Sequence, residues 1–185
     1  MLNEGAIIHG CIKNDKKAQK ALFDKYAPTL LGICMRYAHN RTEAEDVLQQ
    51  SLVKIYFKIN QYSKKGSFEG WMKHIVTNTA ITYYHQNLKY YKNIDIDNIN
   101  EIDSNEYTIN NYNHYKFSEE KILAIINELP DGYRIIFNLY AIEGYKHKEI
   151  AEMLNIEVST SKSQYSRARK IIQKKLTDII NTNDL

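Results

Sequence analysis

The stretch KHKEIAEMLNIEVSTSKSQYSRARKIIQKKL (146–176) decides the fold of the C-terminal part of this chain. Its spacing predicts a short helix from Lys146 to Leu154, then a tight connection whose Ile156 fills the corner, then a longer helix from about Ser159. Two short helices with an apolar residue at the turn make a helix-turn-helix. The core face of the second helix is predicted from residues that lie within about 40° of one direction around the helix axis. These residues are Val158, Ser161, Tyr165, Ala168, Ile172 and Leu176.

The outward face of this second helix has the residue types of a DNA-reading helix. Such helices place their N-terminal residues at base edges in the major groove. Glutamine pairs with adenine edges and arginine with guanine edges, whereas lysines contact phosphates. A solvated basic helix in an all-α domain is the alternative. Lys174 and Lys175 are predicted as further phosphate contacts, and Arg169 is left open between a phosphate contact and an internal salt bridge. The predicted DNA contacts are Thr160, Lys162, Ser163, Gln164, Arg167 and Lys170.

The charge distribution supports nucleic-acid binding by this end of the chain. The 185 residues carry a formal net charge of only +3. However, Ser159–Leu176 holds six basic residues and no acidic one, whereas Asn93–Tyr115 holds five acidic residues and no lysine or arginine. Such asymmetry is typical of nucleic-acid binders.

The N-terminal half is predicted to be helical as well. Pro28 is expected to break the first helix, because proline disfavours helical geometry in the residue before it. Thr42-Glu43-Ala44-Glu45 is predicted to be a capping box that opens the second helix. Ser67 is expected to cap the third, whose buried stripe is predicted to be Phe68, Trp71, Met72, Ile75 and Thr79. The three predicted helices span 15–38, about 42–58 and 68 to about 91.

The second of these helices has two faces that differ in kind. The face that points away from the predicted core carries Val53 and Phe57, although polar residues are expected there. An apolar patch rimmed by polar groups indicates a protein partner, and a second core contact with a neighbouring helix is the alternative. The predicted core face consists of Ala44, Leu48, Ser51, Leu52, Ile55 and Ile59.

The chain divides into two domains around an Asn-rich, acidic segment. We predict an all-α fold with a helical domain over 1–92, a flexible linker over 93–117 and a second helical domain over 118–185. In the second domain, Ser118 and Asp131 are expected to cap successive helices, whose inward residues are predicted to be Ile122, Ile125, Ile126, Leu129, Ile135, Ile136, Leu139 and Tyr140.

Other features limit the function classes. Cys11 and Cys34 lie in apolar helical surroundings without a CxxC pair, which is typical of core thiols in a reducing cytoplasm. No secretory leader or membrane span is predicted. There is no P-loop, metal-ligand spacing or activated nucleophile, so we expect a protein that is not an enzyme and needs no cofactor or metal.

The whole pattern resembles the extracytoplasmic-function (ECF) group of bacterial sigma factors, in the sigma-70 family, over roughly residues 5–92 and 118–180. Two matching domains in the right order are more specific than either alone. Region two is matched by FDKYAPTLLGICMRYAHN (23–40), EAEDVLQQSLVKIY (43–56) and GSFEGWMKHIVTNTAITYYHQN (66–87). Region four is matched by LPDGYRIIFNLYAIEGYKHKEIAEMLNI (129–156) and STSKSQYSRARKIIQKKL (159–176).

The resemblance implies function and partners. Region two of such proteins docks on the clamp helices of the RNA polymerase β′ subunit and captures the minus-ten promoter element, and region four sits on the β flap and reads the minus-thirty-five element. Many relatives are held inactive by an anti-sigma factor. The implied polymerase contacts are Asp46, Gln49, Gln50 and Val53, and the implied minus-ten contacts are His74, Asn78, Thr82, Tyr83 and Gln86.

The chain departs from the family pattern at three positions. Gln50 replaces a usual glutamate, which removes the charge assistance from a hydrogen bond to arginine. Ser159 is expected to cap the second helix of region four in place of Glu157, and Ser161 replaces an apolar core residue.

The predicted function is a promoter-specificity subunit of RNA polymerase that acts in the cytoplasm, without direct membrane insertion. A stand-alone helix-turn-helix regulator is the alternative. Such regulators usually pair as dimers, and the chain has no obvious dimerisation helix.

Overall fold

The computed structural model describes residues 2–91 and 117–183, and within these ranges every regular element is helical. The all-α prediction is therefore confirmed. The chain forms two compact units, Met1–Gln86 and Asn87–Leu185. The predicted linker lies, apart from Phe117, outside the described residues.

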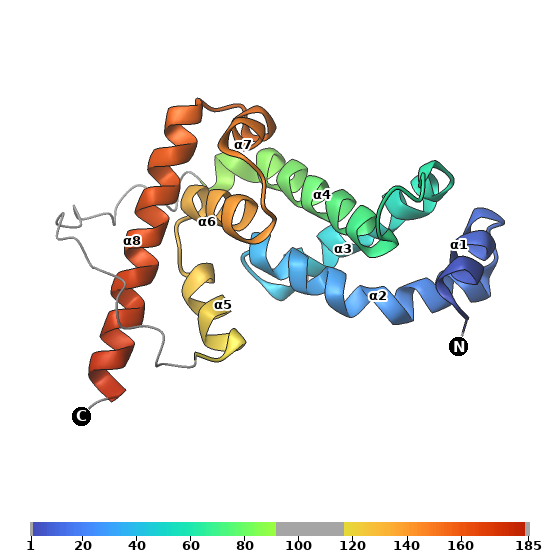
Figure 1. Ribbon diagram of the computed structural model, residues 1–185, viewed down its shortest axis with the longest axis horizontal. Helices are drawn as coiled ribbons and strands as arrows, with labels where there is room; N and C mark the ends of the chain where they lie inside the picture. The colour runs from blue at the N-terminus through green and yellow to red at the C-terminus, as the bar shows by residue number, and fades with distance from the viewer. Residues whose placement is uncertain (1, 92–116, 184–185) are drawn as a thin grey trace. The chain divides into compact units, whose positions relative to one another are not determined.

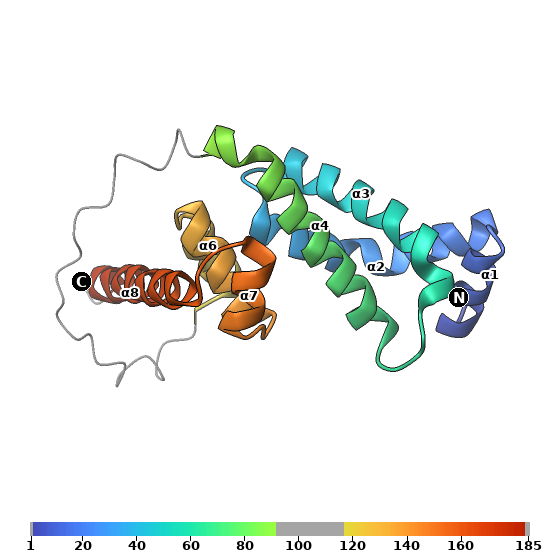
Figure 2. The same ribbon diagram turned by 90° about the horizontal axis from the view of Figure 1, so that it is seen from above.

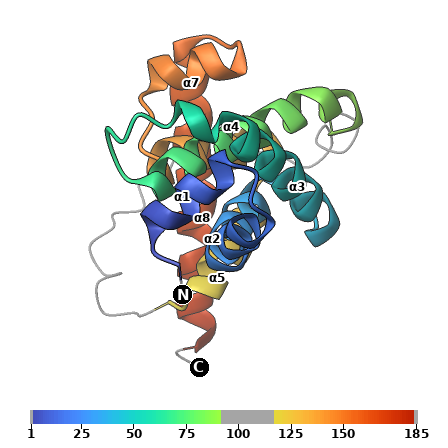
Figure 3. The same cartoon turned by 90° about the vertical axis from the view of Figure 1, so that its right-hand side faces the viewer.

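The first unit is built around one long helix. Helices α1 and α3 both pack against α2 (Figures 1 and 3), and α4 crosses α2 (Figure 2). The core is apolar, with Leu22, Leu30, Ile55, Phe68 and Met72 completely or almost completely buried. The elements are α1 (Glu4–Ile12), α2 (Lys16–Tyr37), α3 (Arg41–Lys58), the 3-10 turn η1 (Ile59–Gln61) and α4 (Phe68–Tyr91).

The predicted break at Pro28 is wrong, because Pro28 lies inside the continuous helix α2. Proline removes one backbone hydrogen bond and costs about 3 kcal/mol in a helix interior. Buried residues on both sides of it, including Leu22 and Leu30, hold the helix in place, and each such leucine contributes about 1.5–3 kcal/mol. Burial therefore outweighs the local cost.

The start of α3 also differs from the prediction. The N-cap is Asn40, whose side-chain oxygen accepts the backbone N–H of Glu43 at 2.9 Å. The Glu43 carboxylate in turn accepts the backbone N–H of His39 at 3.1 Å. Reciprocal capping thus occurs two residues earlier than Thr42, because Asn40 is itself a strong capping residue. The predicted core face of α3 is confirmed, since all six of its residues are buried.

Ser67 caps α4 as predicted, since its hydroxyl accepts the backbone N–H of Gly70 at 3.0 Å. The buried side of α4 includes Phe68, Met72 and Thr79 as expected, but Val76 and Ala80 rather than Ile75 complete it.

The second unit contains the predicted helix-turn-helix, formed by α7 and α8. Asn155 makes the turn in a left-handed conformation, with φ 52° and ψ 52°. Both α6 and α7 pack on α8 (Figure 1), and Tyr133 and Ala168 lie in the shared core. The elements are α5 (Glu119–Asn127), α6 (Asp131–Phe137), the π-helical turn η3 (Asn138–Ile142), α7 (His147–Leu154) and α8 (Val158–Asn183).

Several local predictions for this unit need correction. Ser118 caps α5 as expected, but Ile122 is exposed. Asp131 does not cap α6; it is buried and pairs with Arg134 at 2.7 Å. Helix α8 begins before Ser159, because the Glu157 carbonyl already accepts the N–H of Ser161 at 3.1 Å. Two predicted core residues, Val158 and Tyr140, are exposed.

Candidate nucleic-acid and polymerase interfaces

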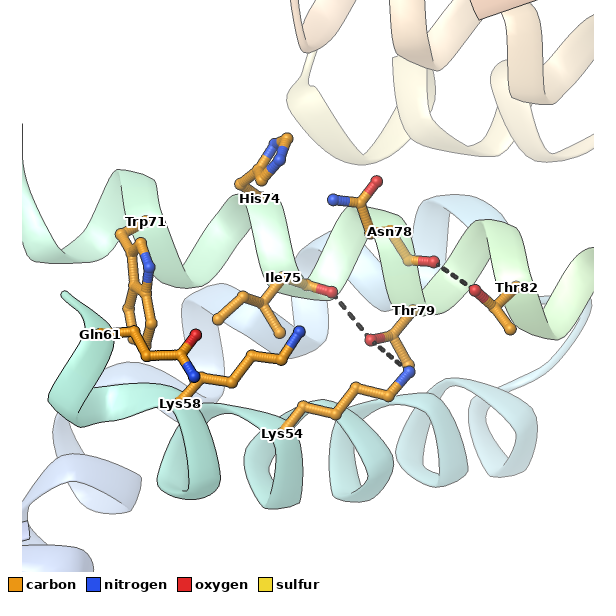
Figure 4. A pocket seen from close by; sticks show the side chains of 9 residues that line it. All are labelled: Lys54, Lys58, Gln61, Trp71, His74, Ile75, Asn78, Thr79 and Thr82. Carbon is orange, nitrogen blue, oxygen red and sulfur yellow. Dashed lines mark hydrogen bonds between the residues drawn. The ribbon is translucent and has the colours of Figure 1, made fainter. Parts of the chain in front are cut away.

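A groove of about 450 Å³ lies between α3 and α4 (Figure 4). Its α3 side carries two lysines one helical turn apart, Lys54 and Lys58. Lys54 donates a hydrogen bond to the Thr79 hydroxyl at 3.2 Å, which donates to the Ile75 carbonyl at 2.8 Å. These two hydrogen bonds hold the side chain of Lys54 in place, whereas the side chain of Lys58 is exposed. The groove therefore has a positively charged wall.

The α4 side of this groove adds an aromatic ring and polar groups. The indole of Trp71 closes one end, next to Gln61, while His74 and Asn78 lie along the edge and point away from α3 (Figure 4). Thr82 lies one turn further on, and its hydroxyl donates to the Asn78 carbonyl at 2.9 Å. A cationic wall facing an aromatic ring is suited to single-stranded nucleic acid.

The structure brings together three of the five predicted minus-ten residues: His74, Asn78 and Thr82 line the groove. Gln86 is exposed one turn beyond it. Tyr83 does not line the groove. Burial raises the pKa of its phenol, and the nearby carboxylates of Glu43 and Asp46 raise this pKa further.

Six of the nine residues that line the groove were not among the predicted minus-ten contacts, and three of these six provide its cations and its ring: Lys54, Lys58 and Trp71. The lysine spacing of four residues beside the core face of α3 was a usable signal. Trp71 was assigned to the core instead, and it is half-buried.

The outward face of α3 is exposed as predicted. Val53 is 52% and Phe57 79% exposed, so a second core contact within the described part of this unit is ruled out for both. The polar members of the face are also exposed: Asp46, Gln49 and Gln50. A five-residue exposed surface on α3 results, and we call these residues the α3 outer face.

An apolar groove of about 670 Å³ adjoins this face, between α2 and α3. Phe23, Leu48 and Leu52 contribute apolar surface, and an ion pair of 2.8 Å between Arg41 and Glu45 lies at its rim. Gln49 lines the groove and also belongs to the α3 outer face. The two surfaces are therefore continuous.

The exposed surface at the start of α8 is centred on Lys162 and Ser163. Gln164 is half-buried and packs against α6, where a Cβ on Gly132 would lie 3.3 Å from its side-chain oxygen. Arg167 donates to the Tyr133 hydroxyl at 3.4 Å. Two predicted base-reading residues thus lie at the side of α8 that faces α6, rather than at the centre of its free surface.

The remaining predicted α8 residues differ in how far they are available to DNA. Thr160 is half-buried, and Lys170 is exposed. Arg169, left open between a phosphate contact and an internal salt bridge, is exposed as well. Lys175 forms an ion pair with Glu128, the residue that follows α5, so the basic surface available for phosphates is shorter than the sequence indicates.

Comparison with known proteins agrees with this two-unit geometry. The family model described as Sigma-70 region 2 matches residues 22–89, and the model described as Sigma-70, region 4 matches residues 119–172. The chain belongs to the sigma-70 family. Curated relatives include the ECF RNA polymerase sigma-E factor of Haemophilus influenzae (29% identical, covering 97% of this chain and 98% of the relative) and the ECF RNA polymerase sigma factor SigW of Bacillus subtilis (29%, covering 90% and 93%).

This sigma factor belongs to the ECF group. It directs promoter-specific transcription initiation by binding core RNA polymerase and reading the minus-ten and minus-thirty-five elements. A solved structure of the sigma factor RpoE with the anti-sigma factor NepR from Bartonella quintana shares its fold, with a TM-score of 0.51 and 20% identity over 85% of this chain and 96% of that chain.

The described parts of the sigma factor hold no candidate metal centre. Residues 2–91 and 117–183 contain no group of three histidine, cysteine, aspartate or glutamate side chains that could hold a metal ion. Cys11 and Cys34 are free and buried, as predicted for core thiols. In the same ranges, no helix has the length and apolar character needed to cross a membrane.

Proposed function

We propose that this sigma factor divides promoter recognition between its two units. The groove between α3 and α4 takes the minus-ten strand, and the exposed start of α8 reads the minus-thirty-five duplex. We assign region two to residues 1–92, region four to 118–185 and a flexible linker to 93–117. The observation that carries the proposal is the α3–α4 groove, which combines cations, an indole and polar edges in one place.

The groove suits an opened strand better than a duplex. Extruding a base costs a few kcal/mol, and stacking on an aromatic ring returns about 1–3 kcal/mol per base. Trp71 offers that ring, Lys58 offers a free cation for a phosphate, and Asn78 offers an amide for a base edge. Tyr83 and Gln86 would contact DNA only beyond the groove.

On α8, Lys162, Ser163 and Lys170 are directly available to DNA. Thr160, Gln164 and Arg167 stay in the proposed site at its edge. The 3.4 Å bond from Arg167 to Tyr133 is long for a hydrogen bond, so the guanidinium can leave it for a base or phosphate. We propose that Tyr133 and Gly132 define the side from which the side chains of Gln164 and Arg167 reach the major groove of DNA.

We propose the α3 outer face, with Asp46, Gln49, Gln50 and Val53, as the site for the β′ clamp helices. The supporting observation is the large exposed apolar surface of Val53 and Phe57 amid polar groups. Region four would contact the β flap. An anti-sigma factor is included among the partners because the related RpoE structure contains one. The protein would act in the cytoplasm with polymerase, without enzymatic activity of its own.

Site-directed photocrosslinking tests the division of labour. Because Cys11 and Cys34 are both buried, a thiol-reactive crosslinker on folded protein should react mainly with an introduced cysteine. In holoenzyme bound to promoter DNA, we expect Asn78→Cys to crosslink at the minus-ten element and Ser163→Cys at the minus-thirty-five element. Lys16→Cys, on the exposed start of α2, is the matched control and should not crosslink. An exchange of the two positions would overturn the assignment.

A further inference from the structure

A polar cluster lies inside the helix-turn-helix, between its two helices. His147 is the first residue of α7, and its ring Nδ1 lies 2.9 Å from the Oγ of Ser161 in the first turn of α8. The ring stacks on Tyr140 of η3, with centroids 4.2 Å apart and planes at 15°. It also forms a T-shaped contact with the ring of Tyr165 of α8, with centroids 5.8 Å apart. His147, itself in α7, therefore connects three successive elements of the DNA-reading unit: η3, α7 and α8.

The partner of His147 is a completely buried hydroxyl. Ser161 is 0% exposed and occupies the core face of α8, where the resemblance implies an apolar residue. A buried hydroxyl is costly unless it has a hydrogen-bond partner. His147 provides that partner, so the two polar residues compensate for each other.

We propose that His147 is a positioning residue for the minus-thirty-five reader, and that it fixes the first turn of α8 through Ser161 while its ring is neutral. The inference rests on the proposed function of α8. The geometry behind it is direct: Ser161 lies in the chain between Thr160 and Lys162, two of the proposed DNA contacts. A change in the His147–Ser161 contact would shift both of them.

A charged ring is disfavoured at this place in the helix-turn-helix. An imidazolium would gain from the face of Tyr140, but it would lose solvation and be repelled by Lys162. Burial, and then Lys162, lower the pKa of His147 from its ordinary value of 6.5, so the neutral ring is favoured. The titratable and charged groups around it are Tyr140 from η3, Lys162 and Tyr165 from α8, and its sequence neighbours Lys146, Lys148 and Glu149.

The sign of the pH effect follows from this lowered pKa. Above pH 6.5 the ring is neutral in both the folded and the unfolded protein, so the contact contributes its full stabilisation. Below pH 6.5 the unfolded chain takes up the proton first, and the contribution falls until the pH passes the lowered pKa of the folded state. Acidification should therefore loosen the start of α8.

Transcription by holoenzyme containing the full chain tests the proposal. The readout is the ratio of transcripts from a template with an intact minus-thirty-five element to those from one with it replaced, at about pH 7.5 and about pH 5.8. This ratio cancels the pH response of the polymerase itself. His147→Asn keeps an amide that can reach Ser161 but cannot titrate, His147→Leu removes the bond, and His9→Asn, at an exposed site on α1, is the matched control.

We expect the ratio of the wild type and of the His9→Asn control to fall about threefold on acidification. His147→Asn should keep the neutral-pH ratio at both pH values. His147→Leu should lower it at both by about five- to tenfold, the size expected for losing one hydrogen bond. A His147→Asn ratio that falls like the wild type would overturn the proposal, even if His147→Leu does not fold. A wild-type ratio near one at neutral pH would instead overturn the function proposed for α8.

Discussion

Replacing Val53 by aspartate should separate polymerase binding from DNA reading. Val53 is 52% exposed on the α3 outer face. Burying a complete valine side chain contributes about 2 kcal/mol, so covering the exposed half at an interface contributes about 1 kcal/mol. An aspartate loses this and leaves a carboxylate without a partner, which costs at least about 2 kcal/mol more. The sum of about 3 kcal/mol corresponds to roughly a hundredfold weaker Kd.

The assay is titration of core polymerase with fluorescently labelled sigma factor. Val53→Ala should lose only the apolar share and weaken binding about fivefold. Ile12→Asp is the matched control, because Ile12 is a similarly exposed aliphatic residue on α1, 47% exposed, outside the proposed interface. If Val53→Asp folds normally and binds core polymerase within twofold of the wild type, the assignment of the α3 outer face is wrong.

Three further predictions concern other parts of the molecule. Lys58→Ala should weaken binding of the minus-ten strand about threefold and reduce the slope of log affinity against log salt concentration by about one, while Lys16→Ala should change neither. Salt titrations of holoenzyme on a fluorescent strand measure both quantities, and equal slopes for the two variants would remove Lys58 from the site. Gln164→Ala and Arg167→Ala should each lower minus-thirty-five-dependent transcription about tenfold, since a base contact provides about 1–3 kcal/mol, and leave polymerase binding intact; weaker polymerase binding by either would contradict the assignment. Pro28→Ala should raise the free energy of unfolding by about 1–3 kcal/mol, because it restores a backbone hydrogen bond in α2; urea unfolding tests this, and a loss of stability would show that the ring of Pro28 contributes more by packing.

The helices and their buried faces could be predicted because both depend on residue spacing within one element. The core face of α3 is an example, since its residues recur at the helical period. Element boundaries were less predictable: Asn40 and Thr42 are both good capping residues, and only the reciprocal bonds between Asn40, Glu43 and His39 decide between them.

The sites were only partly predictable, because they depend on contacts between residues far apart in the sequence. The outward position of Gln164 was expected from α8 alone, but Gly132 of α6, which has no side chain, leaves room for it to pack there. The groove likewise needs Lys54 of α3 beside Thr79 of α4, 25 residues later. Helical periodicity within α3 or α4 cannot reveal such a pairing.

The most direct test of two-point promoter recognition is run-off transcription by core polymerase with this sigma factor on a library in which the minus-ten and minus-thirty-five elements vary independently. Transcripts should require both elements. Lys58→Ala should relax the dependence on the minus-ten element alone, and Arg167→Ala should relax the dependence on the minus-thirty-five element alone. Transcription that is insensitive to either element, or variants whose effects fall on the opposite element, would contradict two-point recognition.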